Sequence, residues 1–194
     1  MKLLLIGGFL GSGKTTLLLQ IASRLSADSL KIAIIENEVG QIGIDGQYLR
    51  REGMEVQELF GGCVCCTLTV DLVSTLEKLK RLFNPDTVIL EATGVALPGD
   101  ILPVVREYAP MVEEIRVILL VDAFRYEMLL EMMTPMVTAQ IGAADIVAIN
   151  KIDEVEEKAV DIIRKSVQTL NGDARVVAIS AEKGLNLNAL MGEL

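Results

Sequence analysis

Short apolar runs alternate with longer amphipathic segments along the 194 residues of this chain. The apolar runs are mostly continuous stretches of Val, Ile and Leu, which is typical of strands that are buried on both faces. The pattern predicts an α/β fold with three layers, in which a mostly parallel sheet carries helices on both faces. The predicted strands are 2–8, 31–37, 55–60, 86–92, 115–123, 145–151 and 174–180, and the predicted helices are about 14–25, 70–82, 99–108, 125–143 with an interruption near Pro135, 154–170 and 187–194.

A single domain is expected over residues 1–194. The length suits one domain with a sizeable core, and the sequence contains no internal repeat, low-complexity stretch or linker rich in Pro and Gly. In open α/β sheets, ligands bind at the carboxyl ends of the strands. The segments that follow the predicted strands are therefore the places to look for functional residues.

The first of these segments, GFLGSGKT from Gly8 to Thr15, fits the phosphate-binding pattern G-x-x-x-x-G-K-[ST] at every defined position. It stands between a predicted strand and a predicted helix, as that motif requires. In such a loop the backbone N–H groups surround phosphate oxygens, the side chain of Lys14 reaches the β- and γ-phosphates, and the hydroxyl of Thr15 ligates Mg²⁺. The predicted phosphate-binding residues are Gly11, Ser12, Gly13, Lys14, Thr15 and Thr16, and Lys14 is also predicted to be catalytic.

The sequence NKID, from Asn150 to Asp153, follows a later apolar run and predicts a guanine site. The carboxylate of Asp153 can accept hydrogen bonds from N1–H and the exocyclic amine of guanine, and adenine lacks both donors. Lys151 can lie along the base, and Asn150 can brace the loop. After the next strand, SAEKG is placed to meet the guanine edge through backbone N–H groups, so Ser180 and Ala181 join the predicted nucleotide site. The alternative is that Asp153 caps a helix that starts at Glu154.

Two further strand ends supply acidic residues. VILEATG places Glu91 at the end of a buried strand and Gly94 just after it. Glu91 is predicted to hold the Mg²⁺ hydration shell or the attacking water, and Gly94 to donate its N–H to the γ-phosphate, so both are predicted to be catalytic. ENEVGQIGID, which begins at Glu36, is predicted to approach Mg²⁺ and to sense the γ-phosphate as a switch. The predicted magnesium ligands are thus Thr15, Glu36 and Glu91. The alternatives are an ordinary strand-end acid and a solvated acidic loop.

All three cysteines of the chain, Cys63, Cys65 and Cys66, lie in GGCVCC, and the chain has no histidine. Such close spacing leaves little room for disulfide geometry. Three thiolates would form a soft anionic site that favours Zn²⁺ or Cu(I) over Mg²⁺. A redox site and simple packing remain the alternatives. In a metal site, the fourth position would be taken by water, by a second protomer, by a client protein or by an Asp or Glu of this chain.

The charge and the N-terminal segment restrict the location and the partners. A formal net charge of −9 argues against nonspecific binding to nucleic acids or anionic membranes. No apolar run approaches the ~20 residues that a bilayer-spanning helix needs. The stretch MKLLLIGGFLGSG could pass for a short signal peptide, but the phosphate loop needs the same residues. A cytoplasmic protein is therefore expected, and in a reducing compartment clustered cysteines are more often metal-binding or catalytic than disulfide-bonded.

Taken together, GFLGSGKTT, ENEVG, GGCVCC, ILEATG, AQIGAAD and NKID occur in the order found in the CobW family of P-loop GTPases, which is related to the nickel-insertion GTPases of hydrogenase and urease. The resemblance runs from Lys2 through SAEKG. It implies a GTP-hydrolysing metallochaperone that uses GTP and Mg²⁺ and binds zinc, or cobalt or nickel, through the cysteines. It also implies a client metalloprotein or cofactor-assembly protein, slow hydrolysis in isolation and a nucleotide-dependent homodimer.

The sequence departs from this family in two respects. Members usually continue into a C-terminal domain and many carry a histidine-rich stretch, whereas this chain ends at Leu194 without a histidine. It is thus either a piece of a longer protein or a short form. Two other functions share the phosphate loop, namely a small-molecule kinase and a noncatalytic module that senses metal or redox state.

Overall fold

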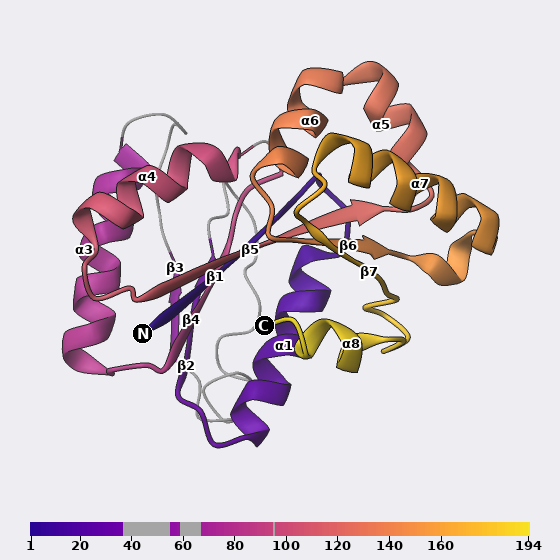
Figure 1. Cartoon of the computed structure of the whole chain (residues 1–194). Helices are drawn as coiled ribbons and strands as arrows, with labels where there is room; N and C mark the ends of the chain where they lie inside the picture. The colour runs from indigo at the N-terminus through magenta and orange to yellow at the C-terminus, as the bar shows by residue number, and fades with distance from the viewer. Residues whose placement is uncertain (37–54, 59–66, 95) are drawn as a thin grey trace.

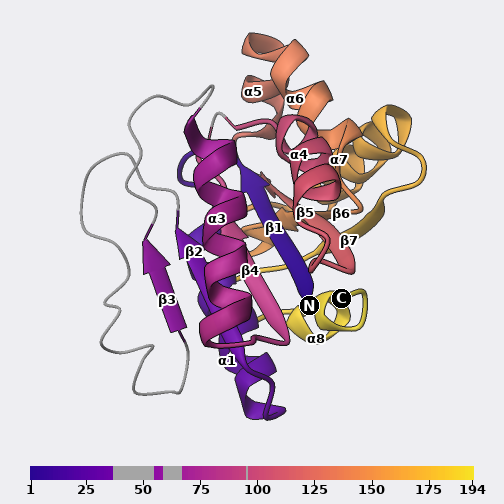
Figure 2. The ribbon, with the colours of Figure 1, turned by 90° about the vertical axis from the view of Figure 1, so that its left-hand side faces the viewer.

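The computed structural model describes residues 1–36, 55–58, 67–94 and 96–194. Seven strands form one sheet in the order β3-β2-β4-β1-β5-β6-β7, and every adjacent pair is parallel. Figure 2 shows β3 at one edge of this sheet. The strands are β1 (Lys2–Gly8), β2 (Ile32–Glu36), β3 (Glu55–Glu58), β4 (Thr87–Glu91), β5 (Glu114–Asp122), β6 (Ile146–Asn150) and β7 (Arg175–Ala178).

Helices cover both faces of the sheet, so the predicted three-layer α/β fold is confirmed (Figure 1). One core lies between the sheet and helices α3, α4, α6 and α7, and the other lies between the sheet and helices α1 and α8. The helices are α1 (Lys14–Ala27), α3 (Thr67–Leu82), α4 (Pro98–Tyr108), α5 (Tyr126–Met132), α6 (Thr134–Gly142), α7 (Glu157–Leu170) and α8 (Leu187–Met191), with a 3₁₀ turn η1 (Ile152–Glu154) before α7.

The central strand β1 shows why its sequence is apolar throughout. Side chains of a strand point alternately to the two faces of the sheet. Leu3 and Leu5 belong to the core that contains α3 and α4, whereas Leu4 and Ile6 belong to the core that contains α1. All four are buried, so a continuous apolar run is what a parallel sheet covered on both faces requires.

The register of the sheet brings the strand ends to one edge. Glu91 at the end of β4 is paired with Ile6 of β1 and with Glu36 of β2. Asp122 at the end of β5 is paired with Asn150 at the end of β6. The predicted site residues that follow β1, β4 and β6 therefore start from the same edge, which is where open α/β sheets bind ligands.

The predicted element boundaries differ from the structure mainly in the last third of the chain. The interruption predicted near Pro135 is confirmed, because the segment 125–143 forms two helices, α5 and α6, with Pro135 in the first turn of α6. The helix predicted over 154–170 begins at Glu157 after the 3₁₀ turn, and the last helix ends at Met191. None of the helices in the described part of the chain has both the length and the apolar character that a bilayer-spanning segment requires.

Two leucines of α3 test the assignment of its buried face. Leu76 is fully buried against the sheet, whereas Leu82 is 69% exposed at the end of the same helix. We expect Leu76→Ala to lower the free energy of unfolding by about 2–5 kcal/mol and Leu82→Ala to change it by less than about 0.5 kcal/mol. Urea denaturation followed by circular dichroism measures both, and equal losses in the two variants would contradict the packing of α3.

Candidate functional site

A cavity of about 350 Å³ opens at the carboxyl edge of the sheet, beyond the ends of β1, β4 and β6. This volume lies within the range of small-molecule sites. The cavity collects residues from the predicted phosphate loop, the predicted guanine loops and the end of β4. Its lining residues are Leu10, Gly11, Gly13, Lys14, Thr15, Thr16, Glu91, Asn150, Lys151, Asp153, Glu154, Ser180, Ala181 and Glu182.

The phosphate end of the cavity is formed by the loop from β1 to α1. Gly13 is the N-cap residue directly before α1, and its φ of 97° lies in the left-handed region that favours glycine. A Cβ atom at this position would also collide with Nδ2 of Asn150. Because glycine has no side chain to cap the helix, and the first turn contains no acidic residue, the N-terminal N–H groups of α1 are available to an anion.

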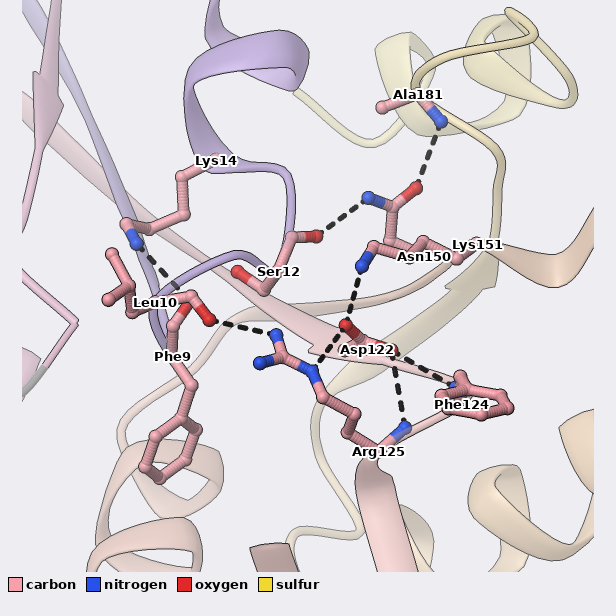
Figure 3. Close-up of polar contacts among 10 residues, drawn as sticks. All are labelled: Phe9, Leu10, Ser12, Lys14, Asp122, Phe124, Arg125, Asn150, Lys151 and Ala181. Atoms are coloured by element: carbon pink, nitrogen blue, oxygen red, sulfur yellow. Dashed lines mark hydrogen bonds and ion pairs between the residues drawn. The ribbon is translucent and has the colours of Figure 1, made fainter. Parts of the chain in front are cut away.

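Lys14 lies beside this loop as a cation without an anionic hydrogen-bond partner among the described residues. Its side chain is buried, and Nζ donates to the carbonyl oxygen of Phe9 at 3.3 Å (Figure 3). Burial lowers the pKa of Lys14, and nearby Arg125 lowers it further while Glu91 opposes the shift. A phosphate group would restore the charged ammonium to a favourable environment, so the cavity is electrostatically suited to an anion at this end.

Thr15 and Glu91 bring oxygen atoms together across the loop. The Thr15 hydroxyl donates to both carboxylate oxygens of Glu91, at 3.0 and 2.9 Å. A hydroxyl beside a carboxylate at the phosphate end is the donor set that Mg²⁺ prefers, so these residues fit the ion. Glu36 ends the neighbouring strand and pairs with Glu91 in the sheet, but its side chain lies outside the described residues. The three magnesium ligands therefore stay predictions.

Asn150 connects the two ends of the cavity. Its buried side chain donates from Nδ2 to the carbonyl oxygen of Ser12 at 2.8 Å, and its Oδ1 accepts from the backbone N–H of Ala181 at 2.9 Å (Figure 3). One amide therefore fixes the phosphate loop relative to the segment after β7. Ser12 itself does not line the cavity, since its side chain is buried. Its hydroxyl has no hydrogen-bond partner among the described residues.

The opposite end of the cavity carries Asp153, and the residues around it favour its charged form. Hydrogen bonding from Ser180 holds the pKa of Asp153 below its ordinary value, with Lys183 and Lys151 contributing as nearby charges. An ionised carboxylate can accept two N–H groups of a base at once. Lys151 has a left-handed backbone with φ 65°, which is uncommon outside glycine and aims the following turn into the cavity.

The sequence prediction missed Asp122, which organises the floor beneath both loops. Its carboxylate is almost fully buried and accepts from Nε of Arg125 at 2.8 Å and from Nζ of Lys151 at 2.7 Å. Nη2 of Arg125 then donates to the carbonyl oxygen of Leu10 in the phosphate loop at 2.8 Å (Figure 3). Asp122 stands at the carboxyl end of β5, so the strand-end criterion used for Glu91 could have found it.

Gly94 lies beside the phosphate loop rather than in the lining of the cavity. A Cβ atom at Gly94 would lie 2.7 Å from the backbone nitrogen of Leu10, so only glycine permits this approach. The predicted metal ligands Cys63, Cys65 and Cys66 lie outside the described residues. Within the described residues, no group of three or more His, Cys, Asp or Glu side chains could hold a metal ion.

Comparison with known proteins gives a match along most of the chain. The family model described as CobW/HypB/UreG, nucleotide-binding domain, matches residues 2–178. The zinc chaperone YeiR of Escherichia coli (strain K12) is 32% identical over 178 residues, which cover 89% of this chain and 53% of the relative. The zinc chaperone YjiA of the same organism is 31% identical over 186 residues, which cover 91% and 56%. The chain thus spans about half the length of these curated relatives.

Two solved structures with the same architecture are those of a YjiA GTPase and of a HypB protein. The crystal structure of Zn(II)-bound YjiA GTPase from E. coli aligns with a TM-score of 0.69 at 28% identity, over 92% of this chain and 57% of that one. The hydrogenase maturation factor HypB from Archaeoglobus fulgidus aligns with a TM-score of 0.74 at 18% identity, over 99% and 87%. The second likeness concerns the fold alone.

Replacing Asp122 tests its place beneath the loops. Burial alone would raise the pKa of Asp122, but hydrogen bonds from Lys151 and Arg125 outweigh it, so the folded-state pKa is lowered. The unfolded state then binds more protons, and the charged carboxylate stabilises the fold above its ordinary pKa of about 3.9. We expect Asp122→Asn to cost about 1–3 kcal/mol at pH 7, a deficit that shrinks as the pH falls through the lowered pKa.

Urea denaturation at pH 7 and at successively lower pH measures this deficit. Asp161→Asn on the exposed face of α7 is the matched control, because it makes the same change of charge on the surface. It should shift the free energy of unfolding by less than about 0.5 kcal/mol at each pH. A deficit of Asp122→Asn that stays constant down to pH 3 would show that the charge of Asp122 does not contribute.

Proposed function

Because the chain belongs to the CobW/HypB/UreG family of nucleotide-binding domains, we propose that it is a GTP-hydrolysing metallochaperone that delivers a metal ion to a client protein. One observation carries the nucleotide part of this proposal. A single cavity has an anion-binding helix terminus and Lys14 at one end and the carboxylate of Asp153 at the other. The amide of Asn150 holds the two ends in a fixed relation.

The proposal favours guanine over adenine because of the charge state of Asp153. The carboxylate of Asp153 is ionised at neutral pH, as an aspartate ordinarily is, and an ionised carboxylate pairs with the two adjacent N–H donors of guanine. Adenine would leave the same carboxylate without donors, which sites of this kind discriminate strongly against. Ala181 lies at the same end of the cavity, where its backbone segment is held by Asn150.

Hydrolysis is proposed to proceed by positioning and charge stabilisation. Lys14 neutralises charge on the β- and γ-phosphates, and the Gly94 N–H meets the terminal phosphate from the other side of the phosphate loop. Thr15 and Glu91, together with Glu36, would hold Mg²⁺, which supplies further neutralisation of phosphate charge when bound. Nothing in these roles requires an acceptor substrate, which separates this function from that of a small-molecule kinase.

The metal part of the proposal rests on the relatives and on the sequence. The relatives are named zinc chaperones, and Cys63, Cys65 and Cys66 supply three thiolates that suit zinc. Cobalt and nickel are the other candidate metals. Strand β3 ends at Glu58, in register with Glu36, and therefore at the same sheet edge that carries the nucleotide cavity.

The proposed partners are a client metalloprotein or cofactor-assembly protein in the cytoplasm and a second copy of the chain when nucleotide is bound.

Asp153→Asn tests guanine recognition. We expect the affinity for GDP, measured by calorimetry, to fall at least about 100-fold, because two hydrogen bonds to a charged group are lost at roughly 1.5–3 kcal/mol each. Glu154→Gln, which removes a carboxylate from the adjacent residue of the same cavity, should change the affinity by less than about threefold. Wild-type protein should release phosphate from GTP without any acceptor. Equal binding of ADP and GDP by the wild type would refute the assignment of guanine.

Zinc titration tests the cysteine site and its link to the nucleotide. Wild-type protein should bind about one zinc ion, and Cys65→Ala should weaken binding at least about 100-fold, since a ligand is lost. The zinc affinity should differ about 5–150-fold between GDP and a non-hydrolysable GTP analogue, the usual range of allosteric coupling. Lys14→Ala should still bind zinc but lose this difference. Equal zinc affinities in both nucleotide states of the wild type would end the coupling hypothesis.

A further inference from the structure

A buried glutamine of helix α6 contacts the loop that follows β4. Gln140 belongs to the sequence AQIGAAD and is only 1% exposed. Its Nε2 donates to the carbonyl oxygen of Ala96 at 3.1 Å and to that of Gly94 at 3.4 Å. Gln140 is 44 residues from Ala96 and 46 residues from Gly94 in the sequence. A buried polar side chain needs partners, and here they belong to a loop that borders the candidate site.

The loop that Gln140 holds is shaped by three further contacts. The backbone N–H of Ala92 donates to Ile6 of β1 at 2.9 Å, and the N–H of Ala96 donates to the carbonyl oxygen of Thr93 at 3.0 Å. The chain therefore leaves the sheet and turns at once. Within this turn, Gly94 approaches the backbone nitrogen of Leu10 so closely that a Cβ atom would lie 2.7 Å from it. The turn thus packs directly on the phosphate loop.

We propose that Gln140 is a positioning residue for the terminal phosphate of the nucleotide, an inference that rests on the proposed function. By holding the carbonyl oxygens of Gly94 and Ala96, the amide supports the turn in which the Ala96 N–H binds the carbonyl oxygen of Thr93 and so orients the Thr93–Gly94 peptide. The Gly94 N–H, which has no acceptor among the described residues, is then held in place for the γ-phosphate. Donors fixed in advance stabilise charge without having to reorganise. Neither Gly94 nor Ala96 lines the cavity, so the two hydrogen bonds of Gln140 act on the site only through the turn.

This role has a signature that simple packing would lack. Only GTP carries a γ-phosphate, so loss of the Gln140 bonds should weaken binding of a GTP analogue and slow hydrolysis while leaving GDP binding intact. A purely structural role would instead lower stability and affect both nucleotides alike. The ratio of the two affinities therefore separates the two roles.

Gln140→Met is the main variant, because it keeps the volume of the side chain and removes the donors. Asn171→Leu is its matched control. Nδ2 of Asn171 also bridges two backbone carbonyl oxygens, those of Ile141 at 2.8 Å and Ala144 at 3.0 Å, at the C-terminal end of the same helix, but neither acceptor belongs to the turn after β4. Calorimetry gives the affinities for GDP and for a non-hydrolysable GTP analogue, and single-turnover assays give the hydrolysis rate.

For Gln140→Met we expect the preference for the GTP analogue over GDP to fall about tenfold, the equivalent of one net hydrogen bond, with hydrolysis slowed at least as much. Asn171→Leu should lower the melting temperature and leave the preference unchanged. If Gln140→Met does not fold, Gln140→Asn, whose amide is one methylene too short to reach, replaces it. An unchanged preference in the folded Gln140 variant overturns this inference alone. A wild-type protein that neither binds nor hydrolyses GTP overturns the proposed function and this inference together.

Discussion

The bond network of Asn150 is the constraint on which the candidate site depends. One buried amide joins the carbonyl oxygen of Ser12 to the N–H of Ala181, and these belong to loops at the two ends of the cavity. Its close approach also explains why Gly13 has no side chain. Without this tie, the phosphate loop and the base end would each be formed locally, but their separation would not be fixed. A ligand that spans both ends needs that separation to be fixed in advance, since ordering it on binding costs affinity.

A second network lies beneath the first and sets the electrostatics of the site. Asp122 binds Lys151 on one side and Arg125 on the other, and Arg125 reaches the phosphate loop at Leu10. The carboxylate pairs with both cations, and one of them, Arg125, is close enough to lower the pKa of the buried Lys14. Lys14 keeps a lowered pKa, because burial dominates its environment. The paired charges of Asp122 keep the site stable when it is empty. A bound anion would add a favourable interaction with the ammonium of Lys14, so a highly charged ligand can bind reversibly.

The sequence predicted the parts of this arrangement that are local and missed those that depend on long-range packing. The phosphate loop and the guanine loop are short motifs with fixed spacing, and their residues line one cavity because parallel strands end at the same edge. The strand-end pattern could have found Asp122, but the ion pair of Asp122 with Lys151 spans 29 residues and the contact of Gln140 with Gly94 spans 46, and no local pattern encodes these partners. The interruption of the helix over 125–143 was predicted from Pro135, whereas the 3₁₀ turn before α7 follows the left-handed backbone of Lys151, whose side chain pairs with Asp122 at the end of β5.

The free energy of zinc binding limits what a bound nucleotide can do to a thiolate site. Structural zinc sites bind with apparent free energies of about 10–16 kcal/mol, whereas coupling between two sites in a protein is typically about 1–3 kcal/mol. A nucleotide can therefore shift the affinity of a thiolate site but cannot empty a tight one by itself. Under the proposed function, a client that offers its own ligands would supply most of the free energy of transfer, and the nucleotide would decide when that exchange is favourable. In that proposal the influence would pass along the sheet edge shared by β3, β2 and β4, where Glu58, Glu36 and Glu91 are in register.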